Sequence, residues 1–168
     1  RSEASRLLDD PRARQSLARF ATQWLGAEPV LTTERKTELP ANIRAEMLQE
    51  VGDFVNHVSF DSSGSFAELY TADYTIADPT LAAFYGYNAP DSEGRVMTGD
   101  QRSGLLGLGA VMVSTAHSDQ TSPIRRGKFI RDRVLCEELG NPPANAATVP
   151  VVDPKDRKST RLNSSHLV

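Results

Sequence analysis

The sequence predicts an all-α or mostly α protein, a helical bundle-like fragment that contains at most one short pairing of two strands. Apolar residues recur at intervals of three and four along several stretches, Ser, Asp and Pro stand where helices would begin, and Gly stands where they would end. The 168 residues are 39% hydrophobic and 24% charged, which is ordinary for a soluble protein and enough for one domain or two small ones. No apolar run approaches the ~20 residues of a membrane span.

The first elements are two consecutive helices. Ser2 to Asp9 reads as the end of one helix, and Asp9 and Asp10 before Pro11 begin a second that Gly26 ends. Five apolar residues at helical spacing form its expected buried face, with the tryptophan as a core anchor: Leu17, Phe20, Ala21, Trp24 and Leu25. The polar stretch 27–39 is expected to be a loop.

A long amphipathic helix is expected from about Asn42 to Ser59. Its buried stripe consists of Ile43, Met47, Val51, Phe54, Val55 and Val58. His57 falls on the neighbouring, more polar surface of the same helix. Residues 61–64 form a turn, and Ser65 caps a short helix that carries Phe66, Leu69 and Tyr70.

Residues 72–99 combine one short helix with the only expected strands. Asp78 and Pro79 begin the helix, and a left-handed cap at Gly86 ends it. Residues 75–76 read as extended and pair with residues 96–97 within an otherwise loop-like stretch. The apolar run Leu105 to Ser114 is ambiguous, and a buried helix is favoured over a strand. Its glycines indicate close helix packing, because a phosphate-binding pattern would need a third glycine where Met112 stands.

The most helix-like stretch is also the most basic one, from Thr121 to Leu139. Ser122 and Pro123 begin this helix, and Gly140 is its expected C-terminal cap. One broad side gathers residues expected to be buried: Ile124, Gly127, Ile130, Val134, Leu135 and Leu139. The single cysteine, Cys136, is expected to be a buried, inert thiol near that side.

Three arginines depart from the local rules of this helix. Arg125 and Arg126 lie in the first turn, where the macrodipole favours acids, and Arg131 projects on the apolar side. Either the three heads reach water, or they pair with buried carboxylates or hold an anion beside Ser122. Candidate carboxylate partners are Asp73, Asp78 and Asp119. The second alternative makes Ser122, Arg125, Arg126 and Arg131 a candidate anion-binding cluster.

No catalytic or metal-binding motif is found. His57 and His117 are sixty residues apart with no second ligand at metal-site spacing, so no metal site is predicted. A nucleophile-elbow pattern and a C-x-x-C-H haem-attachment pattern are missing from the sequence. The catalytic residues are therefore unknown, and no cofactor is expected within this segment.

The C-terminal residues 156–168 are expected to be an unstructured artefact, because DRKSTRLNSSH resembles a translated sequencing adapter. Without that tail, 19 basic residues fall to 16 and 22 acidic residues fall to 21, which gives a net charge of −5. An acidic segment argues against nucleic-acid binding. Residues 140–154 are expected to be extended, and we expect both ends to be cuts within a longer natural protein.

Three blocks of sequence resemble known families: ADYTIADPTLAAFYGY, RSGLLGLGAVMVSTA and TSPIRRGKFIRDRVLCEEL. The first is similar to the end of the domain-of-unknown-function family 1592, and the other two to the adjacent family 1588. Both families are known from large planctomycete and myxobacterial cytochrome-associated proteins. The resemblance implies an exported multidomain protein (periplasm, cell envelope or extracellular) in which a c-type haem lies elsewhere and the neighbouring domains of the same chain are the partners.

These observations give a first helical domain at 1–98 and a second helical segment at 99–155. The expected function is that of a structural or interaction module in a large haem-associated protein. The alternative is part of an enzyme that binds an anionic substrate through the three arginines.

Overall fold

The computed structural model describes residues 2–34, 39–99 and 102–140. This part of the chain contains seven α-helices and one two-stranded antiparallel sheet, so the predicted mostly α fold is confirmed. The chain divides into two compact units, residues 1–114 and 115–168. Each unit is described by itself.

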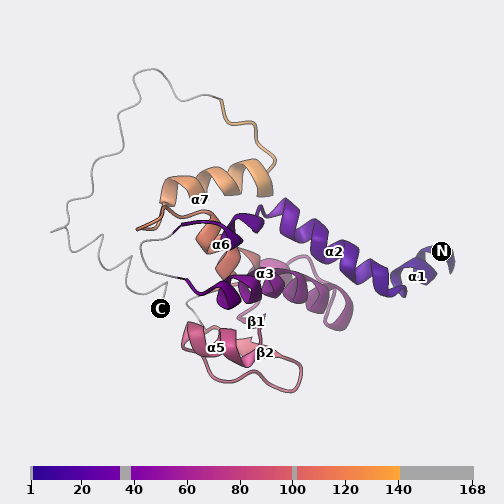
Figure 1. The fold of residues 1–168 in the computed structure, drawn as a ribbon. Helices are drawn as coiled ribbons and strands as arrows, with labels where there is room; N and C mark the ends of the chain where they lie inside the picture. Colours follow the sequence, from indigo (N-terminus) through magenta and orange to yellow (C-terminus); the bar gives the residue numbers. More distant parts are fainter. Residues whose placement is uncertain (1, 35–38, 100–101, 141–168) are drawn as a thin grey trace. The chain divides into compact units, whose positions relative to one another are not determined.

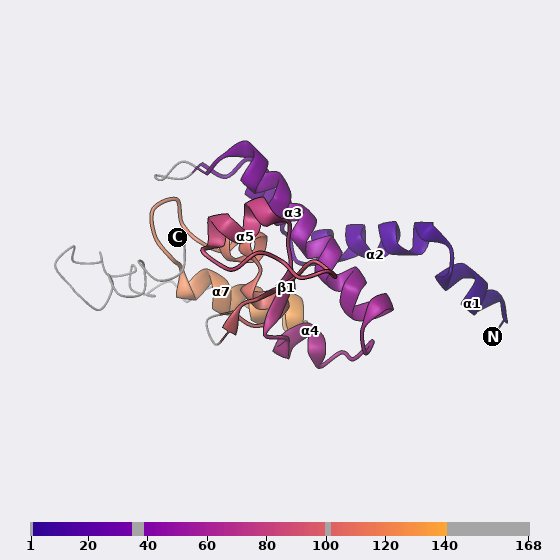
Figure 2. The same cartoon turned by 90° about the horizontal axis from the view of Figure 1, so that it is seen from below.

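The first unit begins with helices α1, Ser2–Leu8, and α2, Pro11–Trp24. The side chain of Asp10 accepts a hydrogen bond from the Arg12 amide and caps α2, as predicted. Gly26 adopts a φ of +58° just after the helix, where a left-handed residue ends it. Helix α1 has no buried residue. Helix α2 packs along α3, and Figures 1 and 2 show that α1 extends away from α3 at the N-terminal end of α2.

Helix α3, Ala41–Asn56, is the centre of the first unit. All six residues of its predicted stripe are buried, with exposed fractions of 5% or less: Ile43, Met47, Val51, Phe54, Val55 and Val58. The helix packs against α2, α5, α6 and the 3₁₀ turn η1, Glu28–Leu31. It continues into a wider π-helical turn, η2, His57–Asp61. Asp61, the last residue of this turn, forms an ion pair with Arg14 of α2 at 2.5 Å.

The predicted strand pairing is present as β1, Tyr74–Ile76, and β2, Arg95–Met97, with Thr75 opposite Val96. Between them, α5 spans Pro79–Tyr85. Asp78 caps α5 by accepting from the Leu81 amide at 2.7 Å, and Gly86 ends it at φ 76°. The short helix α4, Glu68–Thr71, precedes the sheet.

The ambiguous apolar run is helical and buried, as favoured from the sequence. It forms the 3₁₀ turn η4, Leu105–Gly107, followed by α6, Gly109–Ser114. Four of the six residues in α6 are buried: Gly109, Ala110, Val111 and Val113. Both elements pack on α3, and α6 also packs on η1.

In the second unit, helix α7, Pro123–Phe129, continues into a π-helical turn, η5, Ile130–Val134. Ser122 caps α7 as predicted, since its hydroxyl accepts from the Arg125 amide at 3.3 Å. The predicted buried face is wrong: neither α7 nor η5 has a buried residue, and Ile124 is 64% and Leu135 57% exposed. The apolar spacing correctly indicated a helix, but within the described residues no other element buries the apolar side of that helix.

The end of this helix also differs from the prediction. It stops at Val134, and Cys136 takes the left-handed conformation with φ 54°, so Gly140 is not the cap. Cys136 is exposed, which corrects the expected buried thiol. The helix therefore ends five residues earlier than the sequence pattern indicated, and in its wide last turn the Leu135 amide donates a hydrogen bond to the Ile130 carbonyl at 2.9 Å.

Three expectations in the first unit are corrected as well. His57 is buried, because it continues the side of α3 that carries the buried Glu50 and Phe54, and its ring meets the Tyr74 ring edge-on with 5.7 Å between the centroids. Trp24 is half-buried and stacks on Phe20, which is 59% exposed, so neither is a core anchor. Part of the expected loop 27–39 is the turn η1, and its Val30 is buried. The expectations for residues 141–168, including the adapter-like tail, lie outside the described residues.

Candidate functional site

The centre of the first unit holds a buried carboxylate. Glu50 of α3 is only 2% exposed, and it lies on the apolar stripe of that helix. Its Oε1 accepts a hydrogen bond from the Thr75 hydroxyl at 2.8 Å, and its Oε2 accepts from the Tyr85 hydroxyl at 2.8 Å and the Gly109 amide at 3.2 Å. One carboxylate thus ties α3 to β1, α5 and α6.

The electrostatics of this centre are set by burial. Desolvation raises the pKa of Glu50 above its ordinary value, while the hydrogen bonds from its neighbours and the charge of Arg102 act in the opposite direction. Desolvation and the adjacent Glu50 also raise the pKa of the Tyr85 hydroxyl. The guanidinium of Arg102 lies over the Tyr85 ring, with 4.3 Å between its central carbon and the ring centroid, and 5.9 Å from the centroid of Tyr87.

The geometry around Glu50 suits both protonation states. An ionised carboxylate accepts from all three donors, whereas a protonated Oε1 can donate to the Thr75 hydroxyl, which is donor and acceptor alike. In that second state, Oε2 still accepts from Tyr85 and Gly109. The chain therefore supplies hydrogen-bond partners to both oxygens of Glu50 with or without a charge.

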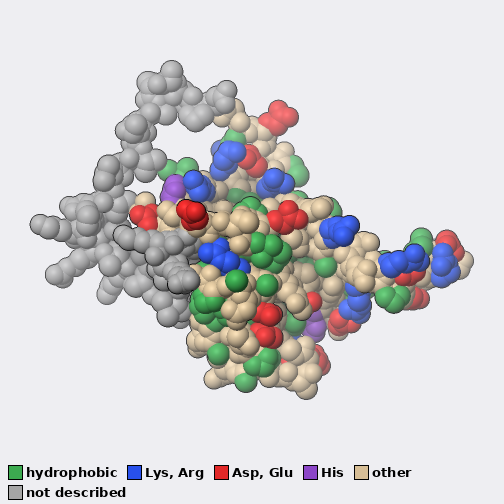
Figure 3. Space-filling view, in the orientation of Figure 1, with side chains coloured by type: hydrophobic (Ala, Val, Ile, Leu, Met, Phe, Trp, Pro, Cys, Tyr) green, Lys and Arg blue, Asp and Glu red, His purple; other side chains and the backbone are tan. Residues whose placement is uncertain are grey.

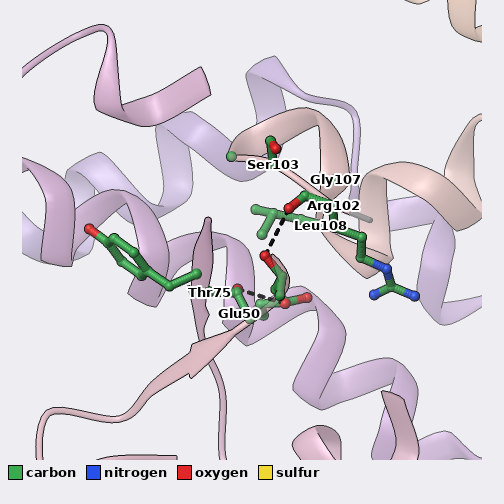
Figure 4. Close-up of a pocket in the computed structure, with 9 residues that line it drawn as sticks. Glu50, Thr75, Arg102, Ser103, Gly107 and Leu108 are labelled. Atoms are coloured by element: carbon green, nitrogen blue, oxygen red, sulfur yellow. Dashed lines mark hydrogen bonds between the residues drawn. The ribbon is translucent and has the colours of Figure 1, made fainter. Parts of the chain in front are cut away.

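The cavity beside Glu50 is very small. Figure 4 shows Glu50 and Thr75 at its floor, with Arg102, Ser103 and Leu108 on the facing segment. Its volume is about 10 Å³, close to what a single water molecule needs. The cavity is therefore far too small for an organic substrate in this structure.

A second polar cluster surrounds Glu68 of α4. Its carboxylate accepts from the hydroxyls of Ser62 at 2.8 Å and Tyr74 at 2.5 Å, and from that of Ser63. Hydrogen bonds from these hydroxyls lower the pKa of Glu68 to about 2. Desolvation, with the hydrogen bond to Glu68, raises the pKa of Tyr74 to about 12. The cluster fastens the turn after η2 to α4 and β1.

The four residues of the predicted anion-binding cluster have separate surroundings. Ser122 is used as the cap of α7, and Arg125 donates to the Ala116 carbonyl at 3.0 Å. Arg131 donates to Glu137 at 2.5 Å, and this ion pair is about half exposed, so the predicted partners Asp73, Asp78 and Asp119 are not needed for it. Arg126 has a buried Nε without a hydrogen-bond partner among the described residues, and desolvation lowers the pKa of its guanidinium.

The surface shows no strong segregation of charge on the face in Figure 3, where cationic and acidic side chains are interspersed. Within residues 2–34, 39–99 and 102–140, no group of three or more His, Cys, Asp or Glu side chains is placed to hold a metal ion. The same described ranges contain no helix with the length and apolar character that crossing a membrane requires.

The sequence interpretation missed Glu50 and its partners. One signal was available: Glu50 lies three residues after Met47 and four before Phe54, so an acid interrupts the apolar stripe. The expectation of close packing at the glycines is confirmed. A Cβ added to Gly109 would lie 2.0 Å from the Tyr85 hydroxyl oxygen, so only glycine lets α6 reach Glu50.

Comparison with known proteins identifies two family models on this chain. The model described as PSD4, a protein of unknown function (DUF1592), matches residues 1–87. The model described as PSCyt3, a protein of unknown function (DUF1588), matches residues 102–166. Searches of curated proteins and of solved structures find no match. Since the first model covers more than half of the 168 residues, this chain belongs to the PSD4 (DUF1592) family, and a segment similar to DUF1588 begins 15 residues after the end of that match.

Proposed function

We propose that this chain is a structural module that joins neighbouring domains of a larger exported, haem-associated protein, and that it is not a catalytic centre. The observation that carries the proposal is the hydrogen bonding of Glu50 by groups of the chain itself. Both of its oxygens are occupied by donors of the chain itself, beside a cavity of about 10 Å³. A catalytic carboxylate needs a free position for substrate or solvent, whereas a structural one is fully hydrogen-bonded.

The exposed face of α7 and η5 supports an interaction role. Ile124 and Leu135 are more than half exposed at the two ends of this helix. In the same stretch, Lys128 pairs with Asp132 at 2.8 Å and Arg131 pairs with Glu137, so two of its cations are neutralised while the two apolar side chains remain exposed. In the proposed function, a neighbouring domain of the same natural chain covers this face. The c-type haem would lie in another domain, in line with the family resemblance, and nucleic acid is not among the proposed partners.

Amide hydrogen exchange tests the proposal. The natural protein that carries this sequence would be compared with residues 1–140 alone, and protection would be read at residues 124–135. We expect slower exchange there in the longer protein, because a covering domain removes the helix from solvent. Equal exchange in the two proteins would contradict the interaction role. An absorption spectrum of the longer protein tests the haem association separately.

The alternative is part of an enzyme that binds an anionic group through Arg125, Arg126 and Arg131. The observation in its favour is the buried, unpartnered Nε of Arg126. Titration with inorganic phosphate, followed by amide chemical shifts, distinguishes the two functions. The structural module predicts no saturable shift, and the enzyme predicts one that is lost in Arg126→Met while the fold is retained.

A further inference from the structure

The segment 102–114 lies inside the core of the first unit, although it falls within the match to the second family. Leu105 is fully buried and Leu108 is 2% exposed. In α6, Ala110 and Val113 are at most 1% exposed. These side chains pack on α3 and, through α6, on η1, both of which belong to the first family's match. The segment therefore supplies apolar surface that α3 needs in order to be enclosed.

Polar contacts join the same two parts of the chain. The Gly109 amide donates to Glu50 at 3.2 Å, and the Gly104 amide donates to the Ala72 carbonyl at 2.9 Å. The Ser114 hydroxyl donates to the Ala27 carbonyl at 3.2 Å. Without residues 102–114, these acceptors would lose donors at three separate places in the first family's match.

The fit between the two parts is close at the level of the backbone. Gly104 has a φ of +50°, and a Cβ built on it would lie 2.3 Å from the Leu69 carbonyl oxygen. A Cβ on Gly109 would collide with the Tyr85 hydroxyl. Contacts this tight are typical of a single packed core and are not typical of the surface between two independent domains.

The small cavity beside Glu50 is assembled from both parts. Glu50, Tyr74 and Thr75 come from the first family's match. The opposite side consists of five residues from the second: Arg102, Ser103, Gly104, Gly107 and Leu108.

We infer that the border between the two families lies within one folding unit. Residues 102–114 complete the core of residues 1–99, so the first family's segment does not form its native fold without the beginning of the second. This inference stands independently of the proposed function, because it concerns contacts within the first unit alone.

The single tryptophan provides the test, because Trp24 reports on α2 and belongs to the first family's match. In the full chain, Leu105→Ala should lower the thermal transition seen by Trp24 fluorescence by about 5–15 °C, as for a large cavity in a core. Val113→Ala should act in the same direction with a smaller shift. Leu135→Ala is the matched control, an exposed leucine in the same family match, and should leave the transition unchanged.

A Trp24 transition that stays in place in both Leu105→Ala and Val113→Ala would overturn the inference.

A second measurement covers variants that fail to fold. A protease site inserted after Gly99 in the full chain should, once cut, yield two fragments that elute together in native buffer and separate in urea. The same site after Asp119 controls for the insertion and should leave the Trp24 transition unchanged. If the two fragments cut after Gly99 separated in native buffer, and the fragment 1–99 kept the thermal transition seen by Trp24 fluorescence, the inference would also be overturned.

Discussion

Helices α3 and α7 show the same kind of sequence pattern and opposite fates. Both carry apolar residues at helical spacing, and both begin near a proline. The stripe of α3 is enclosed by α2, α5, α6 and η1, whereas α7 and η5 have no buried residue within the described chain. Periodicity therefore indicates which side of a helix is apolar, and only the neighbouring elements decide whether that side is buried.

The largest difference between the two helices is expected from side-chain truncation. Phe54→Ala in α3 removes a fully buried ring and should lower the free energy of unfolding by about 3–5 kcal/mol. Ile124→Ala in α7 should change it by less than about 0.5 kcal/mol, because that side chain is 64% exposed. Urea unfolding followed by circular dichroism measures both. Similar losses for the two variants would show that α7 is as firmly enclosed as α3.

The next effect concerns the polar interruption of the α3 stripe. Glu50→Ala leaves the donors of Thr75, Tyr85 and Gly109 without their acceptor and should cost about 2–4 kcal/mol. Glu50→Gln should cost less than about 1 kcal/mol, since its amide can donate to Thr75 while its oxygen accepts from the other two. A loss in Glu50→Gln as large as in Glu50→Ala would mean that the negative charge itself holds the core together.

The pH dependence of Glu50 has a definite sign. Burial raises its pKa in the folded state above the ordinary 4.5, so the folded protein binds this proton more tightly than the unfolded chain. Its contribution to stability is therefore complete below pH 4.5 and is lost as the pH rises through the folded-state pKa. Between pH 4.5 and the folded-state pKa, the free energy of unfolding should therefore decline, and Glu50→Gln should make this decline shallower. An unchanged slope in this variant would contradict the raised pKa.

Glu68 should show the opposite sign and a smaller effect. Its pKa falls from 4.5 to about 2, so its contribution is present above pH 4.5 and is lost as the pH falls toward about 2. Because this carboxylate is partly exposed, the change should stay below about 1 kcal/mol. Glu68→Gln should make the acid limb of the unfolding curve shallower, and an unaltered acid limb would argue against the Ser62 and Tyr74 contacts.

The smallest effect is expected in α7 and η5. Arg131→Met breaks an ion pair with Glu137 that is about half exposed, and should change stability by less than about 0.5 kcal/mol. The variant would be compared with wild type in low and high salt. A larger, salt-insensitive loss would show that Arg131 is buried by a part of the protein beyond the described residues.

Much of the fold could be predicted from local rules. The caps at Asp10, Asp78 and Ser122 and the left-handed Gly86 follow from short-range backbone chemistry, which the sequence states directly. The pairing of β1 with β2 was also found, because two short extended stretches flank one helix.

The rest depended on contacts that are distant in the sequence. The two π-helical turns insert a wider turn that periodicity does not signal, and His57 is buried by its contact with Tyr74, which lies 17 positions away in the sequence. The Glu50 centre joins residues up to 59 positions apart, so neither Thr75 nor Gly109 carries a local sign of its role. The predicted arginine cluster remains a prediction, because charge alone does not say what an arginine contacts.

The buried carboxylate has a consequence for how the helices of the first unit align. A purely apolar contact between α3 and α6 would tolerate sliding, because one methyl group replaces another at little cost. If α3 slipped by one helical turn, about 5.4 Å, Glu50 would lose the hydrogen bonds that it accepts from three separate segments. The acid thus sets the register of the core, so that of the many ways to bury the same apolar surface, one arrangement is selected.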